Sequence, residues 1–82
     1  MKTNLYCVED LVSGEFLPVF EARNDKTAVR DVRKALSSGN QEIKDFRIVG
    51  LGSVIRNDEN RSFDIIVLPK YYLDLFAHEE IL

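Results

Sequence analysis

Hydrophobic residues between positions 24 and 39 recur with the spacing of an α-helix. The apolar stripe at this spacing consists of Ala28, Val29, Val32, Ala35 and Leu36. Basic side chains fall on the other side. Asn24 or Asp25 can cap the first turn by accepting a backbone N–H bond, and Gly39 can end the helix in a left-handed conformation. The segment predicts one helix that packs on the rest of the molecule and presents cations outward.

Four other segments have the composition and alternation of β-strands, at residues 4–9, 16–23, 46–55 and 62–68. Polar turns at residues 10–15 and 56–61 separate neighbouring strands. Pro18 has no backbone N–H, so the second strand should lie at a sheet edge or contain a bulge. Gly50 and Gly52 fall on one face of the third strand. This spacing indicates close backbone approach, a bulge, or room for a large side chain opposite.

The C-terminal segment, residues 69–82, has no clear period and forms either a short helix or an extended arm. The order of the elements predicts a single α+β domain, residues 1–82, with a four-stranded antiparallel sheet and one amphipathic helix in the order β-β-α-β-β. One helix covers only one face of such a sheet, while residues 65–68 are apolar on both faces. Because bare apolar faces and open strand edges are costly, we expect a homodimer or a higher cyclic oligomer.

The composition limits the class of protein. The chain has 82 residues, a net charge of −3 and a single cysteine, which excludes an internal disulfide and a thiolate zinc site. No apolar run approaches the roughly 18 residues that a membrane span needs. We therefore expect a soluble, cytoplasmic protein with no membrane partner.

Charge is unevenly distributed along the chain. Residues 23–47 include seven basic and four acidic side chains, whereas residues 57–82 include two basic and six acidic ones. This polarity can steer a polyanion to one side of the molecule, and it can equally bring the ends of neighbouring subunits together. The alternative to a binding role, for any single charged residue, is an ordinary solvated position on the surface.

Catalytic and metal-binding patterns are weak. His78, the sole histidine, lies near the C-terminus beside two glutamates, where catalytic geometry is hard to hold. Cys7 has no base nearby in the sequence and is interpreted as a small core residue. Residues 58–60 lack the ligand spacing of a calcium loop. We expect no enzyme activity, no metal site and no cofactor.

Basic and aromatic residues are the remaining candidates, because small nucleic-acid modules combine cations for phosphates with rings for base stacking. The candidate nucleic-acid-binding residues are Arg23, Lys26, Arg30, Arg33, Lys34 and Arg47. The candidate stacking residues are Tyr6, Tyr71 and Tyr72, since tyrosine tolerates partial exposure. Lys44 belongs to the same basic stretch, and most phenylalanines are expected in the core. The alternative for the helical cations is a face that only keeps the protein soluble.

Several short motifs resemble a small nonstructural protein of gokushovirus-type microphages, which have circular single-stranded DNA genomes. The resemblance rests on residues 5–10 (LYCVED), 13–16 (SGEF), 18–25 (PVFEARND), 28–30 (AVR) and 45–52 (DFRIVGLG). The turn at residues 57–60 and the segment 70–82 depart from the family pattern. The resemblance implies a non-virion phage protein that binds DNA and is linked to viral DNA replication, with Arg23 and Arg30 as matching positions for phosphate contact.

Two functional hypotheses follow. The first is a phage-encoded nonstructural accessory protein that binds single-stranded DNA as a homo-oligomer and assists viral DNA replication. The second is a homo-oligomeric protein-interaction or scaffold-like module whose acidic, tyrosine-rich C-terminal segment contacts a host or phage protein. A small enzyme built around Cys7 or His78 is the least favoured alternative.

Overall fold

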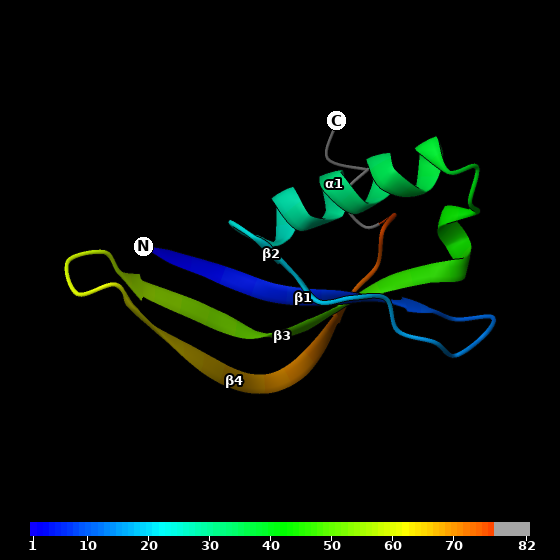
Figure 1. Cartoon of the computed structure of the whole chain (residues 1–82). Helices are drawn as coiled ribbons and strands as arrows, with labels where there is room; N and C mark the ends of the chain where they lie inside the picture. Colours follow the sequence, from blue (N-terminus) through cyan, green and yellow to red (C-terminus); the bar gives the residue numbers. More distant parts are fainter. Residues whose placement is uncertain (77–82) are drawn as a thin grey trace.

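One α-helix packs on one face of a four-stranded antiparallel sheet in the computed structural model, which describes residues 1–76 (Figure 1). The elements are β1 (Lys2–Asp10), β2 (Phe20–Ala22), α1 (Asp25–Ser38), the 3₁₀ helix η1 (Ile43–Asp45), β3 (Phe46–Asn57) and β4 (Ser62–Leu73). The strand order β2-β1-β3-β4 places β2 and β4 at the two edges. The predicted α+β fold, with a four-stranded antiparallel sheet and one helix, is confirmed, and η1 is an element that the sequence pattern did not predict.

The helix begins and ends at the predicted residues, with Gly39 as its C-cap, but the conformation of that cap differs. Asn24 caps it, because the Asn24 side chain accepts the backbone N–H of Thr27 at 2.9 Å. The predicted left-handed conformation of Gly39 is wrong: its φ is −90°, and the next residue, Asn40, has the left-handed φ of 57°. Asparagine tolerates this conformation because its short polar side chain can bond locally. Ala35 is the one member of the predicted stripe that is exposed.

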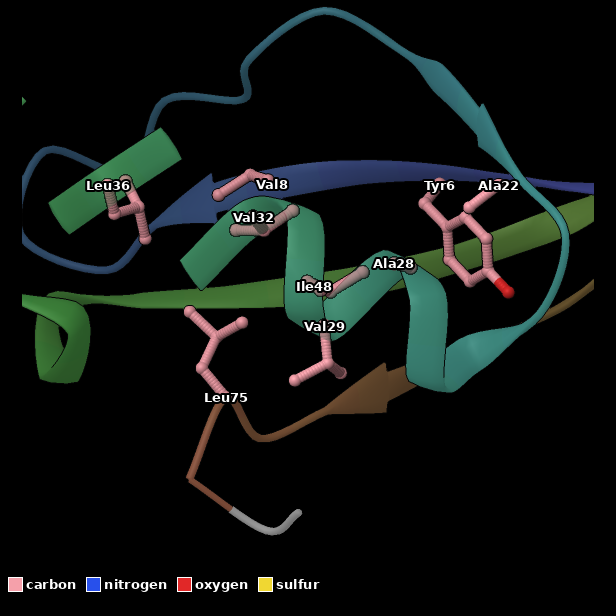
Figure 2. Close-up of a cluster of buried hydrophobic side chains, with 9 residues drawn as sticks. All are labelled: Tyr6, Val8, Ala22, Ala28, Val29, Val32, Leu36, Ile48 and Leu75. Atoms are coloured by element: carbon pink, nitrogen blue, oxygen red, sulfur yellow. The ribbon is translucent and has the colours of Figure 1, made fainter. Parts of the chain in front are cut away.

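The core lies between α1 and the sheet (Figure 2). Its fully buried members include Tyr6 of β1, Ile48 of β3 and Leu75, which follows β4. Figure 2 shows Leu75 beneath α1, so the segment after β4 turns back and closes the core under the helix. Part of the C-terminal segment is therefore a core element rather than a separate arm.

β4 continues five residues beyond its predicted end at Leu68. Gly52 pairs with Val67 and Gly50 pairs with Tyr71, so three residues of β4 lie opposite Leu51 of β3. This bulge contains Pro69. A proline is tolerated there because β4 is an edge strand and need not donate every backbone bond. The predicted short helix or arm starting at Pro69 is wrong for the stretch up to the end of β4.

A second irregularity, between β1 and β3, changes the positions of the two glycines. Gly50 pairs with Tyr6 and Gly52 pairs with Leu5, two adjacent residues, so the glycines lie opposite different faces of β1 rather than one. A Cβ at Gly50 would overlap the ring of Tyr71, whereas a Cβ at Gly52 would overlap the backbone carbonyl of residue 66. Of the predicted alternatives, room for a large side chain is therefore confirmed at Gly50, close backbone approach at Gly52, and a bulge between them.

β2 is much shorter than the predicted strand 16–23. Phe16 makes only an isolated bridge to Glu9, and the regular strand starts at Phe20, after Pro18. The predicted edge position of this strand is confirmed. Proline lacks the N–H that an uninterrupted ladder needs, so it splits the strand into two short contacts.

A single carboxylate joins the first turn of α1 to two strands. The hydroxyl of Tyr6 (β1) donates to Asp25 Oδ1 at 2.7 Å, and the hydroxyl of Tyr71 (β4) donates to the same oxygen at 2.8 Å. Asn4 donates to the Tyr6 hydroxyl at 3.1 Å, which completes its hydrogen bonding. Burial, followed by the bond to Asp25, raises the pKa of both tyrosines. We call this arrangement the Asp25 clamp.

We predict that Asp25→Ala lowers the free energy of unfolding by about 2–3 kcal/mol, because it leaves a fully buried hydroxyl without its acceptor. Urea denaturation provides the measurement. Asp31→Ala is the matched control on the same helix, since Asp31 is exposed and should change stability by less than about 0.5 kcal/mol. Equal effects of the two substitutions would contradict the structural role of the clamp.

The two glycines should respond differently to a compensating substitution. Gly50→Ala should destabilise the protein by about 1–3 kcal/mol through overpacking, and Tyr71→Ala should relieve most of that cost because it removes the overlapping ring. Gly52→Ala should cost the same with or without Ile66→Ala, because its overlap is with backbone. A double-mutant cycle by chemical denaturation measures both couplings. Gly50→Ala costing the same in both backgrounds would show that the ring does not lie over Gly50.

Candidate nucleic-acid interface

Four basic side chains of α1 lie away from its buried stripe, and we call them the basic flank: Lys26, Arg30, Arg33 and Lys34. Two of them, Lys26 and Arg33, lie on the β4 side of the helix. Arg33 Nη1 donates to the carbonyl of Leu75 at 3.2 Å, and Lys26 lines a shallow hollow with Tyr71. The opposite flank, with Asp31 and Ala35, instead lines an apolar hollow together with residues 17–20. Helical spacing thus separates the cations of α1 from its acidic and apolar positions.

The members of the basic flank differ in how free they are to contact a ligand. Arg30 pairs with Asp31 at 3.1 Å, but both side chains are more than half exposed, so the pair is screened and weak. Lys26 and Lys34 are exposed and form no ion pair with any residue in the range 1–76. Arg23, also exposed, directly precedes the N-cap. Lys26 and Lys34 are therefore the most available anion contacts.

Arg47 does not join the helical cations. Ile48 faces α1, so the alternation of β3 turns Arg47 to the opposite face of the sheet. There its Nε donates to Glu9 Oε1 at 2.6 Å, and its guanidinium lies 3.9 Å from the centre of the Tyr72 ring. Arg47 remains a candidate for nucleic-acid binding, but it lies on the other face of the sheet from the helical cations.

Arg47 instead contributes to a hollow at the C-terminal end of β4, with a volume of about 370 Å³. We call it the aromatic-basic hollow; its lining residues are Leu11, Lys44, Phe46, Arg47, Tyr72, Leu73, Asp74 and Phe76. The Tyr72 ring is 54% exposed and the Phe76 ring 42% exposed. Exposed rings beside cations can stack bases and hold phosphates. Sequence reasoning left Lys44 and Phe76 out of the site because it predicted neither η1 nor the turn after β4.

The three tyrosines proposed for stacking fall into different environments. Tyr6 is fully buried and bonded to Asp25, so the stacking role predicted for it is wrong. Tyr71 is 36% exposed, and its hydroxyl is held by the same carboxylate. Only Tyr72 combines high exposure with a position in the aromatic-basic hollow. The strand pattern showed that Tyr6 and Val8 share a face, but not that this face is the one under the helix.

The structure also places the candidates considered for catalysis and metal binding. Cys7 is buried as a small core residue, and burial raises the pKa of its thiol. Within residues 1–76 no group of histidine, cysteine, aspartate and glutamate side chains is placed to hold a metal ion. His78 lies outside the described residues. None of the helices in the described part of the chain has the length and apolar character needed to cross a membrane.

Comparison with known families gives one result. The sequence matches the family described as Phage ORF5 protein over residues 3–72. The chain belongs to this family. The match runs from the start of β1 to Tyr72, so it includes α1, all four strands and most of the aromatic-basic hollow. It confirms a family of phage proteins, and its description assigns no activity. No curated protein and no solved structure matches the chain.

Proposed function

We propose that the protein binds single-stranded DNA as a nonstructural accessory factor in the replication of a phage genome. The observation that supports this most is the link between its two basic sites. Arg33 of the basic flank holds the carbonyl of Leu75, and the next residue, Phe76, lines the aromatic-basic hollow. The basic flank of α1 is therefore connected, through residues 75 and 76, to a hollow that contains exposed rings and two further cations, Lys44 and Arg47.

This arrangement suits the two parts of a single strand. The phosphates can follow Lys26, Arg30 and Lys34 along the helix, since each contact releases counterions. An unstacked base can then lie on Tyr72 or Phe76, where stacking contributes about 1–3 kcal/mol per base. Bases in a duplex are not free to stack in this way, which favours a single strand as the ligand. The concentration of positive charge on one side allows binding despite a net charge of −3.

We predict that Lys26→Glu/Lys34→Glu weakens binding to a labelled thymidine oligonucleotide at least tenfold in about 50 mM salt. Fluorescence anisotropy provides the measurement. Each lost phosphate contact should also reduce the slope of log affinity against log salt by about 0.7, so the double substitution should lower it by about 1.4. The matched control is Lys2→Glu/Arg61→Glu, which makes the same charge change at exposed positions outside the basic flank. Equal losses for both variants, or no binding by the wild type, would refute the proposed site.

Base stacking in the hollow is tested separately. Tyr72→Leu/Phe76→Leu should weaken binding about fivefold or more, whereas Phe16→Leu, an exposed ring outside the hollow, should leave the affinity unchanged. The difference should disappear with an abasic oligonucleotide, which offers phosphates but no bases. An unchanged affinity of the Tyr72→Leu/Phe76→Leu variant would exclude the hollow and leave the basic flank as the only contact.

The alternative function is a homo-oligomeric interaction module that contacts a phage or host protein. It is favoured by the exposed apolar residues of β4, which include Phe63, Ile65 and Val67. Of the C-terminal segment first considered for this role, the part up to Leu73 belongs to β4, and residues 77–82 lie outside the described structure. If the wild-type protein self-associates but binds no oligonucleotide, this alternative function is favoured.

A further inference from the structure

We propose that two copies of the chain pair through their β4 edges, antiparallel, about a two-fold axis at Ile65. The pairing joins the two four-stranded sheets into one sheet of eight strands. It concerns a surface of the molecule separate from the basic flank, and it does not depend on the protein binding DNA.

The outer edge of β4 has free backbone groups. β3 lies on its inner side, and no other strand among residues 1–76 lies on its outer side. The backbone N–H and C=O of Arg56 both bond to Met1, so Arg56 points toward β1 and away from β4. Its partner Phe63 therefore directs its own N–H and C=O outward, and strand alternation does the same for Ile65 and Val67. These three residues offer six backbone groups to a further strand.

The same three residues expose their side chains on the face of the sheet opposite α1. Phe63 is 63% exposed, Ile65 55% and Val67 83%. On the helix side, Ile66 is 41% exposed, because α1 does not reach this end of the sheet (Figure 1). Natural edge strands are usually protected by charges, prolines or bulges, but residues 63–68 include only Asp64. The open edge is thus a site for strand addition.

The sequence of this edge fits a second copy of itself. In the register centred on Ile65, Phe63 of each copy lies opposite Val67 of the other, and Ile65 lies opposite its own counterpart. Aromatic and β-branched residues form favourable cross-strand pairs. Asp64 lies opposite Ile66, so no two like charges are directly opposed. All three outward-pointing residues exchange bonds in this register, which yields six backbone hydrogen bonds across the axis.

The bulge defines the end of the paired segment. Pro69 and the bulge lie just beyond the paired residues and prevent the ladder from extending further. Two-fold pairing closes the assembly at a dimer because each copy has one such edge in residues 1–76.

The symmetry also affects the basic flanks. The axis of an antiparallel edge pair is perpendicular to the sheet, so both helices lie on the same face of the joined sheet. In each copy α1 begins near Tyr71 and runs away from the β3–β4 turn, so the two helices lie at opposite ends of this shared face. This consequence rests on the proposed function: dimerisation would place two sets of DNA-binding cations on one face of the joined sheet.

Proline substitution tests the backbone bonds directly. Ile65→Pro removes an outward N–H and no bond to β3, so circular dichroism and thermal unfolding should show a folded protein. Its dimer dissociation constant, from sedimentation or light scattering over a concentration series, should rise at least tenfold. Ile65→Thr keeps the N–H and should raise the constant much less. Val67→Lys, at a highly exposed position, should also weaken the dimer.

Cysteine cross-linking tests the register. In a Cys7→Ala background, Ile65→Cys should form an intermolecular disulfide on mild oxidation, because the paired Cα atoms would be about 5.5 Å apart. Phe63→Cys should not form a disulfide, because the two cysteines would be four residues apart along the paired strands. A wild-type protein that stays monomeric at several hundred micromolar would overturn the proposal. Equal dimerisation of Ile65→Pro and Ile65→Thr, or faster cross-linking of Phe63→Cys, would overturn it as well.

Discussion

Asp25 accepts hydrogen bonds from Tyr6 and Tyr71 with one carboxylate oxygen, and this determines which part of the sheet the helix covers. α1 starts at the clamp and runs away from the β3–β4 turn (Figure 1). Its 14 residues span about 21 Å, whereas the 12 residues of β4 span about 40 Å. The helix therefore lies over the C-terminal half of β4 only, from Tyr71 onward, while the N-terminal half, Ser62 to Val67, lies beyond the first turn of the helix.

The two halves of β4 have different chemical roles as a result. On the covered half, Leu75 completes the core and brings Phe76 and the aromatic-basic hollow next to the basic flank. On the bare half, apolar side chains and backbone groups remain open to a second copy. The bulge at Pro69 separates the two halves. One short helix on a long sheet thus accounts for both the candidate DNA surface and the candidate dimer edge.

The correctly predicted parts of this fold depend on residues that are close together in the sequence, whereas the parts that were missed depend on contacts between distant residues. The helix, its N-cap and its basic flank follow from residues that are close together in the sequence, and the structure contains them. Burial of Tyr6 depends on Asp25, 19 positions later, and the extension of β4 depends on a bulge opposite Leu51. The aromatic-basic hollow combines residues from three separate stretches of the chain, at 11, 44–47 and 72–76. None of these contacts has a periodic signal, so sequence reasoning proposed Tyr6 for stacking and left Lys44 and Phe76 out of the candidate site.

Amide hydrogen exchange along β4, measured by NMR at low and high protein concentration, tests the account most directly. We expect the amides of Asp64 and Ile66, whose N–H groups point to β3, to exchange slowly at both concentrations. The amides of Phe63, Ile65 and Val67 should exchange rapidly in dilute protein and become protected as the concentration rises. Protection of these three amides at every concentration, or at none, would contradict the claim that this half of β4 is bare in the single chain and paired in the dimer.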